Sequence, residues 1–420
     1  MDYKKQLETL SSYFKNAESK KETHKIGVEF EHLILHEDLT AVSYFEKNGI
    51  EKLLEELSKK SDWEKVYEGK HLIGLNSNNK AITLEPGGQL ELSIIPFADL
   101  KQIETIYLDF IEKLVNILNK WDQKIAVLGY QPHSLINNIP LLPKKRYDFM
   151  YKYFKDKGKY AHNMMKGTAS VQMSIDYINE EDYIKKMRVG YFISPVIYYL
   201  FDNTPFFEGK KADKSSAREN IWTNCDSQRS GTINDIFDKK YGYNDYAEYL
   251  LKIPPIIKKK NGKLIYTDNK VLKDVMENDK TKEIEHFLSM VFPDVRTQKY
   301  IEFRAADALP YPYNFAFITL LKNIFYNQKN LNYLYQRSLK YNQKKFINFK
   351  KEMVEDKKST KRSEFIAEIL KKTKNTATKY ELDFLKILEA SYLKYGPLKF
   401  KTLNNLDKGK KEALNWCLLN

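Results

Sequence analysis

The chain has 420 residues, enough for a large buried core and two or three domains, and 14% of them are aromatic. Its opening segment is too charged for a signal peptide, and the longest largely apolar run, Val189 to Phe201, is too short to span a membrane. With only Cys225 and Cys417, a disulfide framework is excluded, so we expect a soluble cytoplasmic protein with no membrane partner.

The net charge of +14 is concentrated near the end of the sequence. Leu321 to Asn420 contain 23 Lys and Arg against 10 Asp and Glu, a net charge of +13. Basic surfaces that bind nucleic acid usually interleave aromatics and glycines. This segment instead shows apolar residues at helical spacing, for example Phe365, Ile366, Ile369 and Leu370. We therefore predict solvated, lysine-rich helix faces and no nucleic-acid partner.

The first third of the chain is predicted to alternate helices with strands. Helices are expected over residues 2–17, 45–58 and 103–118, and the last has the most regular 3.6-residue apolar stripe. A strand is expected in KIGVEFEHL, where Glu29 and Glu31 lie on the face opposite Ile26, Val28 and Phe30. This strand therefore presents two carboxylates on its polar face.

The stretch ITLEPGGQLELS, residues 82–93, is predicted to be a β-hairpin. Two alternating runs flank Pro-Gly-Gly, which favours a turn because Pro fixes φ and Gly accepts positive φ. Ile82 and Leu84 fall on one face, while Glu85 and Glu91 fall on the other. The hairpin adds two more carboxylates to a polar sheet face.

In the remainder of the chain, strands are predicted at 126–130, 164–177 and 295–306. Helices are expected near Lys145, at 181–201 and 282–291, and throughout the chain beyond Pro310. Residues 202–220 read as a mobile loop at the mouth of a site, and 241–281 as loop and hairpin outside the core. We predict an α+β fold: a curved, mostly antiparallel sheet with helices on its convex face and a helical C-terminal region.

If these strands share one sheet, their polar side chains project into one concave space. The side chains are Glu29, Glu31, Glu85, Glu91, Gln172, Glu302 and Arg304. Five carboxylates cannot all ionise side by side without cations. Surface salt bridges would explain any single glutamate, but the whole set favours hard divalent ions, Mg²⁺ or Mn²⁺, bridging substrate phosphates.

Several of these strings resemble the plant and proteobacterial type of glutamate–cysteine ligase. The strings are IGVEFEHL, ITLEPGGQLELS, MMKGTASVQMSIDY, RENIWTNCDSQRSG and YIEFRAAD, and the resemblance covers roughly Lys25 to Gln328. It implies a glutamine-synthetase-like fold and ATP-dependent formation of γ-glutamylcysteine from glutamate and cysteine, through γ-glutamyl phosphate.

The resemblance also implies roles for individual residues. Glu29, Glu31, Glu85, Glu91, Gln172 and Glu302 would hold the metal ions. Arg304 would stabilise the phosphoryl group, and Arg218 and Arg229 would hold glutamate or phosphate. Arg146, Gln172, Arg218 and Trp222 would contact the amino-acid substrate, although Trp222 also suits a packing role. Cys225 is expected to be incidental, and His32, His36 and His162 to be structural.

Two alternatives remain open from the sequence. The first is a related carboxylate–amine ligase that uses another acid or amine, and the second is a nucleic-acid or scaffold protein on an inactive ligase fold. The intact acidic positions argue against the second. We expect a catalytic domain at 1–328, a basic helical region at 329–420 packed on it, and a monomer or homodimer.

Overall fold

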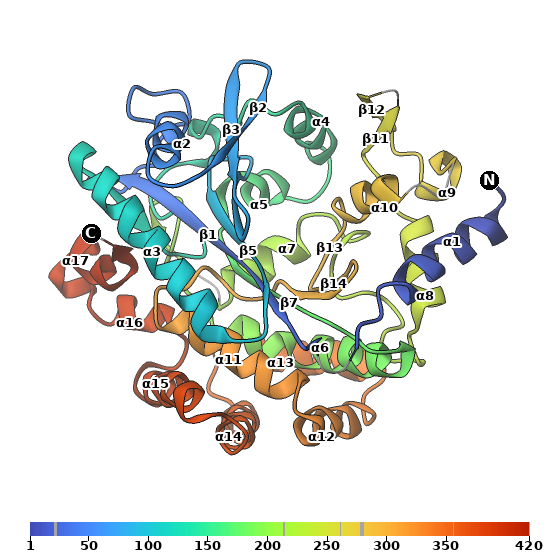
Figure 1. The fold of residues 1–420 in the computed structure, drawn as a ribbon. Helices are drawn as coiled ribbons and strands as arrows, with labels where there is room; N and C mark the ends of the chain where they lie inside the picture. Colours follow the sequence, from blue (N-terminus) through green and yellow to red (C-terminus); the bar gives the residue numbers. More distant parts are fainter. Residues whose placement is uncertain (21–22, 213–214, 261, 278–280, 356, 420) are drawn as a thin grey trace.

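The computed structural model describes residues 1–20, 23–212, 215–260, 262–277, 281–355 and 357–419. Within them a ten-stranded antiparallel sheet forms one layer, in the order β14-β15-β7-β1-β5-β4-β3-β2, with β6 and β16 attached along the end of β1 (Figure 1). Its strands are β1 Ile26–His36, β2 Glu64–Glu68, β3 His71–Asn76, β4 Lys80–Leu84, β5 Leu90–Phe97, β6 Gln123–Ala126, β7 Val171–Ile175, β14 Val295–Thr297, β15 Ile301–Phe303 and β16 Leu418–Leu419.

Seventeen α-helices in the described residues pack around the sheet or continue the fold beside it. They are α1 Tyr3–Lys15, α2 Ile50–Ser58, α3 Leu100–Leu118, α4 Lys145–Phe154, α5 Ala161–Gly167, α6 Glu180–Leu200, α7 Ala217–Thr223, α8 Tyr243–Leu251, α9 Leu272–Val275, α10 Thr281–Leu288, α11 Tyr313–Phe325, α12 Gln328–Ser338, α13 Gln343–Val354, α14 Thr360–Lys374, α15 Lys379–Tyr395, α16 Lys399–Leu403 and α17 Lys410–Leu414. Three two-stranded ribbons complete the fold: β8 Phe206–Phe207 with β9 Lys210–Lys211, β10 Ser230–Gly231 with β13 Phe292–Pro293, and β11 Ile257–Lys260 with β12 Lys263–Tyr266.

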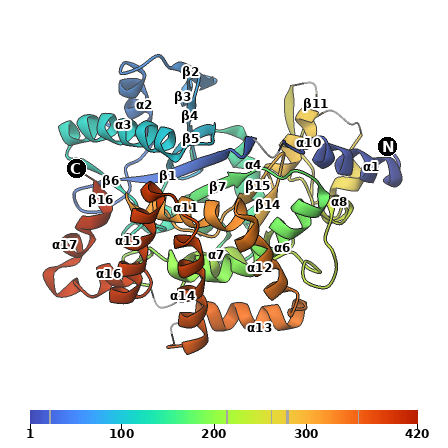
Figure 2. The same cartoon turned by 60° about the horizontal axis from the view of Figure 1, so that its bottom comes forward.

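The apolar face of the sheet is buried under α3, α6 and α11 (Figure 2). The rings of Phe30 on β1 and Tyr107 on α3 lie 4.4 Å apart, and those of Phe303 on β15 and Phe325 on α11 are equally close. Burial of such large apolar side chains is the main stabilising term in the fold. Because this face is covered, the alternate residues of the same strands point to the other side, where the site lies.

The predicted α+β architecture with its antiparallel sheet is confirmed. Helices predicted at 2–17, 103–118 and 181–201 correspond to α1, α3 and α6, and the hairpin at 82–93 corresponds to β4 and β5 with Leu84 opposite Leu90. Burial of the apolar hairpin positions is complete, since Ile82, Leu84, Leu90 and Leu92 are all inaccessible to solvent.

Several predicted boundaries are wrong. Residues 295–306 are not one strand but the hairpin β14–β15, with Arg296 opposite Glu302, because the chain turns at 298–300 without a Gly or Pro to signal it. The first part of 164–177 belongs to α5, the short strand predicted at 126–130 is β6 at Gln123–Ala126, and 241–281 also contains α8. The loop predicted at 202–220 ends in α7, and its residues 213 and 214 lie outside the described residues.

The C-terminal helices pack on α6 and α11, and the chain returns to the sheet at its end. The stripe of Phe365, Ile366, Ile369 and Leu370 is buried as predicted, in one continuous core with the sheet. Leu418 pairs with Ala126, so β16 extends the sheet. No described helix has the length and apolarity that crossing a bilayer would need. The division into domains at residue 328 stays a prediction.

Candidate active site

The register of the sheet brings the predicted carboxylates together on the face opposite α3, α6 and α11. Glu31 on β1 lies directly opposite Glu91 on β5, and Glu91 lies opposite Thr83 on β4. Two residues along β1, Glu29 is flanked by Ser93 on β5 and Gln172 on β7. The polar residues of four adjacent strands therefore form one patch.

Part of this patch is hydrogen-bonded. Glu31 accepts from the Ser170 backbone N–H at 2.8 Å and from Gln172 Nε2 at 2.9 Å, while Glu91 accepts from the hydroxyls of Thr83 at 2.7 Å and Ser93 at 3.1 Å. Within the described chain, no hydrogen bond reaches the carboxylates of Glu29 or Glu85. These two groups keep their oxygens available for a ligand.

Burial and mutual repulsion shift the ionisation of the carboxylates. Desolvation, together with Glu85 and Glu91, raises the pKa of Glu31 to about 8. Desolvation and the neighbouring Glu85 raise the pKa of Glu91 to about 7, although its two hydroxyl donors oppose the shift. Desolvation, with Glu91 and Glu302, also raises the pKa of Glu29 well above its ordinary value. Such a group of acids has a strong electrostatic preference for a cation.

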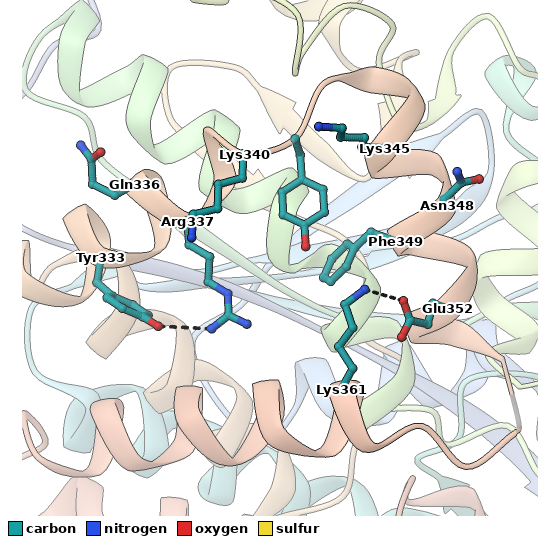
Figure 3. Close-up of a pocket in the computed structure, with 10 residues that line it drawn as sticks. Tyr333, Gln336, Arg337, Lys340, Lys345, Asn348, Phe349, Glu352 and Lys361 are labelled. Carbon is teal, nitrogen blue, oxygen red and sulfur yellow. Dashed lines mark hydrogen bonds and ion pairs between the residues drawn. The ribbon is translucent and has the colours of Figure 1, made fainter.

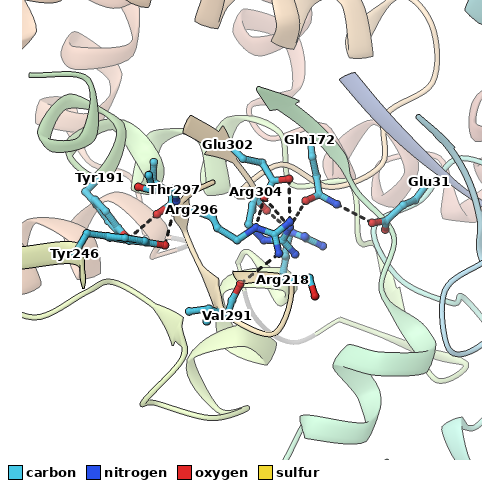
Figure 4. A network of polar contacts seen from close by, with 12 residues as sticks. Glu31, Gln172, Tyr191, Arg218, Tyr246, Val291, Arg296, Thr297, Glu302 and Arg304 are labelled. Atoms are coloured by element: carbon cyan, nitrogen blue, oxygen red, sulfur yellow. Dashed lines mark hydrogen bonds and ion pairs between the residues drawn. The ribbon is translucent and has the colours of Figure 1, made fainter. Parts of the chain in front are cut away.

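Glu302 differs from the other carboxylates because its charge is already balanced. It accepts from Arg296 Nε at 2.7 Å and Nη2 at 3.0 Å, and from Arg304 Nη1 at 3.0 Å (Figure 4). Burial alone would raise the pKa of Glu302, but the two guanidinium groups hold it below its ordinary value. Its oxygens therefore hold two arginines in place, and a role for Glu302 as a metal ligand stays a prediction.

Arg304, Arg218 and Trp222 meet beside the carboxylates. Arg304 Nη1 donates to Gln172 Oε1, and Arg218 Nε donates to the Arg304 carbonyl at 3.0 Å. The Trp222 ring centroid lies 5.5 Å from the Arg218 guanidinium carbon and 5.6 Å from that of Arg304, close enough for cation–π attraction. Trp222 thus packs against both arginines, and its contact with a substrate stays a prediction.

A cavity of about 70 Å³ opens between these groups. Glu31, Glu85, Arg218, Arg304 and Trp222 all line it. Arg218 Nη1 and Arg304 Nε are buried and find no acceptor among the described residues. Buried guanidinium donors without partners are costly, so this cavity is suited to an anionic group.

The structure does not bring Arg229 to this cavity. Its side chain is completely buried and donates to Asp226 at 2.8 Å, to the Tyr153 hydroxyl at 2.6 Å, and to the carbonyls of Met290 and Pro254. Every guanidinium nitrogen already donates to the protein, and the role predicted for Arg229 in holding glutamate or phosphate stays a prediction. These contacts join the end of α7 to α4.

Arg146 lies at the edge of the site. Arg146 Nη2 donates to the Ser289 carbonyl at 2.8 Å, and burial lowers its pKa while the charge of Glu85 opposes that shift. It does not line the cavity. Contact between Arg146 and a substrate carboxylate stays a prediction.

The sequence did not predict that Arg296 and Lys144 lie at the site, nor that apolar side chains line one side of the cavity. In one continuous strand, Arg296 and Glu302 would lie on the same face but six residues apart. The turn between β14 and β15, which the sequence did not reveal, places Arg296 directly opposite Glu302. Lys144 donates to the Leu84 carbonyl at 2.9 Å, and burial lowers its pKa against the opposing charges of Glu85 and Glu91. The apolar side of the cavity is lined by Met150, Met164, Met165 and Phe292. The only sequence feature that could have pointed to Lys144 is the run of basic residues, Lys144 to Arg146, directly before Tyr147.

Other candidate features lie outside this site. A larger cavity, of about 730 Å³, lies between α12, α13 and the start of α14, where Lys361 pairs with Glu352 (Figure 3). Arg337, which also lines it, pairs with Glu368. Cys225 is buried, and burial raises the pKa of its thiol, which supports the expectation that it is incidental. His32 is buried beside Tyr107, and desolvation lowers its pKa to about 4.

The donor chemistry of the patch fits a hard divalent cation. Glu29, Glu31, Glu85 and Glu91 supply carboxylate oxygens, which is the ligand type that Mg²⁺ and Mn²⁺ prefer. In the described residues, however, no three acidic, histidine or cysteine side chains are already gathered at metal-binding distances. The ligands are therefore present on one face, but they are not arranged as a closed cage.

Comparison with known proteins identifies the family. The profile of glutamate-cysteine ligase family 2 matches residues 25–363, past the point where recognisable motifs end. Chloroplastic glutamate–cysteine ligase A of Oryza sativa subsp. japonica is 31% identical over 334 residues, which cover 77% of this chain and 67% of that protein. The chloroplastic glutamate–cysteine ligase of Nicotiana tabacum is 32% identical over the same share of this chain and 63% of its own.

One solved structure supports the fold. The glutamate–cysteine ligase of Francisella tularensis, in complex with AMP, superposes with a TM-score of 0.58 over 94% of this chain and 87% of that one, at 11% sequence identity. At 11% identity this likeness shows the fold alone, whereas the family profile and the plant relatives show the family. This chain belongs to glutamate–cysteine ligase family 2.

Proposed function

We propose that this ATP-dependent ligase joins the γ-carboxylate of glutamate to the amine of cysteine. The observation that carries the proposal is the cavity lined by Glu31 and Glu85 together with Arg218 and Arg304, two arginines that each keep one buried nitrogen without an acceptor among the described residues. Cationic donors beside a cluster of acids suit a reaction that brings a carboxylate and a polyphosphate together. Family membership and the AMP bound to the Francisella tularensis relative support ATP as the nucleotide.

The reaction would proceed in two displacements. A γ-carboxylate oxygen of glutamate attacks the γ-phosphorus of ATP, and ADP leaves, which gives γ-glutamyl phosphate. The amine nitrogen of cysteine then attacks the acyl carbon, the carbon–oxygen bond to phosphate breaks, and the nitrogen loses a proton as the amide forms. Arg218 would hold a substrate carboxylate, and Arg304 would stabilise the transferred phosphoryl group, because both cationic residues line the cavity.

Glu29, Glu31, Glu85 and Glu91, with Gln172, would hold the metal ions. Bound Mg²⁺ or Mn²⁺ would neutralise the phosphate charges of ATP. Glu302 would fix Arg304 by the hydrogen bond that the two already share. Cytoplasmic location, a monomeric or homodimeric state, and the absence of nucleic-acid and membrane partners stay predictions from the sequence.

Phosphate release from ATP tests the proposal. We expect release that requires Mg²⁺ or Mn²⁺ and glutamate, rises with cysteine rather than with other amines, and is matched by γ-glutamylcysteine. The variant Glu85→Gln should fold but lose turnover, since it removes charge with little change in volume, whereas Glu112→Gln on the exposed side of α3 should behave as the parent. Release that prefers another acid or amine would assign a different carboxylate–amine ligase.

A further inference from the structure

A buried ion pair joins the C-terminal region to the segment that leads into α7. Lys399 Nζ lies 3.0 Å from Asp202 Oδ2, and the two side chains are 2% and 1% exposed. The Lys399 backbone N–H also donates to the Asp202 carbonyl at 2.7 Å. The cost of desolvating two charges offsets much of their attraction, so a buried ion pair is weak evidence of a stabilising role. A role in positioning neighbouring residues is the alternative.

Asp202 also contacts Ser216, the residue at which α7 begins. Its Oδ2 accepts from the Ser216 backbone N–H at 2.7 Å, and its Oδ1 accepts from the Thr204 backbone N–H at 3.2 Å. Ser216 has φ of 50°, a left-handed conformation that is unfavourable for residues with a side chain. The Ser216 hydroxyl in turn accepts from the Glu219 backbone N–H at 3.3 Å and caps α7. Asp202 therefore holds the strained residue at which α7 begins.

Arg218 depends on the placement of this short helix. It follows Ser216 by two residues, so a displacement of the helix start moves its guanidinium group. Arg218 is 3% exposed and lines the cavity; only its Nε donates within the described chain, to the Arg304 carbonyl, and its buried Nη1 has no acceptor there. The backbone of α7 therefore determines where this buried side chain enters the site, beside its contacts with Trp222 and Arg304.

We propose that Lys399 is a positioning residue that sets Arg218 in the active site by way of Asp202 and Ser216. Lys399 begins α16, which lies outside the residues matched by the family profile. The C-terminal region thus completes the active site of this chain as well as covering its core. The inference rests on the proposed function only in that Arg218 holds a substrate.

Kinetics of four single variants and one double variant of the full-length chain test the inference. In Lys399→Met we expect the KM for glutamate to rise at least about tenfold with the KM for ATP nearly unchanged, because misplacing a binding group by about 1 Å can cost roughly 10²-fold. Lys399→Arg should restore part of the loss. Lys401→Met is the matched control, since Lys401 in the same helix contacts Tyr313 and Trp416 and not Asp202. In an Arg218→Lys background, Lys399→Met should raise the glutamate KM no further.

Additive effects of Lys399→Met and Arg218→Lys would overturn the inference, as would an equal rise in both Michaelis constants. Hydrogen exchange of amides 217–223 gives a readout that needs no substrate: exchange should be faster in Lys399→Met than in the parent and in Lys401→Met. Equal exchange in all three would also overturn it. If Lys399→Met fails to fold, Lys399→Arg is compared with the parent and with Lys401→Met in the same kinetic and exchange measurements. A parent that makes no γ-glutamylcysteine would refute the proposed function, while the exchange experiment would still decide the positioning.

Discussion

At the scale of single residues, the site separates carboxylates that are paired from carboxylates that are not. Glu302 is balanced by two guanidinium groups, and its pKa is held low. Glu31 faces Glu91 across the β1–β5 ladder, and both pKa values are raised. Like charges directly opposite each other destabilise a sheet, so the protein carries this cost where a ligand of opposite charge can remove it.

This arrangement predicts a pH-dependent stability. The pKa of Glu31 is about 8 and that of Glu91 about 7 in the folded chain, against an ordinary value of 4.5. The folded state therefore retains protons that the unfolded state releases, so this contribution is fully present below about pH 4.5 and is lost as pH rises through about 7 to 8. We expect the melting temperature without divalent ions to fall between about pH 5 and 8, and the stabilisation by added Mg²⁺ to grow over that range.

Thermal unfolding of two variants checks the cause. In Glu91→Gln the Glu31 carboxylate loses a like-charged neighbour, so the melting temperature should fall less steeply with pH. The exposed Glu112→Gln should keep the dependence of the parent. Identical slopes in the parent and both variants would contradict the assignment of the effect to the carboxylate patch.

The sequence was sufficient to predict which residues lie at the site, but not the contacts that each of them makes there. The parity of Glu29, Glu31 and Glu91 along their strands was sufficient to place them on one face, because side chains alternate strictly in a sheet. The role of Arg229 could not be read this way. Its partners Tyr153, Met290 and Pro254 are distant in sequence, and only the tertiary fold reveals that they occupy the guanidinium group.

At the scale of elements, the β4–β5 hairpin is held by contacts at its turn. Gly88 has φ of 86°, which favours glycine, and Pro86 accepts from the Leu142 backbone N–H at 2.9 Å. The Gln89 amide donates to the carbonyls of Met165 and Thr168 on and beside α5. The alternation of residues predicted this hairpin correctly, but its docking on α5 depends on contacts with no local sequence signal.

Gly87 tests the importance of that docking. A Cβ at this position would lie 2.3 Å from the Lys166 carbonyl oxygen and 2.9 Å from its carbonyl carbon, so Gly87→Ala must separate the turn from α5. We expect a loss of about 1–3 kcal/mol in the free energy of unfolding and a large loss of turnover, because Glu85 lies at the same turn. Chemical denaturation and the phosphate-release assay measure the two effects.

Gly69→Asn is the control for the Gly87 variant. Gly69 lies in the β2–β3 turn of the same sheet with φ of 62°, a conformation that Asn tolerates, and no atom lies within 4 Å of a Cβ built there. This variant should retain stability and turnover. A Gly87→Ala protein as stable and active as the parent would show that the hairpin does not need its contact with α5.

At the scale of the whole molecule, the basic C-terminal region is part of the folded body. Arg188 on α6 donates to Ser338 Oγ at 3.1 Å and to the Tyr341 carbonyl at 2.8 Å. The Phe192 ring on the same helix stacks on Phe349 at 5.1 Å and contacts Phe365. The net charge of this region would suit a separate polyanion-binding module, but its apolar stripes face the catalytic body, as predicted, and Lys399 is buried with them.

A chain shortened to residues 1–328 tests this organisation. It would lose the partners of Arg188 and Phe192 on α6, as well as Lys399 and the β16 strand that pairs with β6. We expect aggregated protein without turnover, because apolar surfaces of this extent do not stay soluble when uncovered. Size-exclusion chromatography and the phosphate-release assay would show it.

The full chain provides the complementary measurement. If its basic helices served a polyanion, affinity for DNA or RNA would be high at low salt and fall steeply as salt rises, because each neutralised phosphate releases counterions. We expect only weak binding at about physiological salt, since the lysines lie scattered over several helices and many pair with acids, as Lys374 does with Glu389 and Lys322 with Glu381. Tight, salt-sensitive binding by the full chain, together with a soluble and active 1–328 chain, would show instead that the C-terminal region is an independent polyanion-binding module.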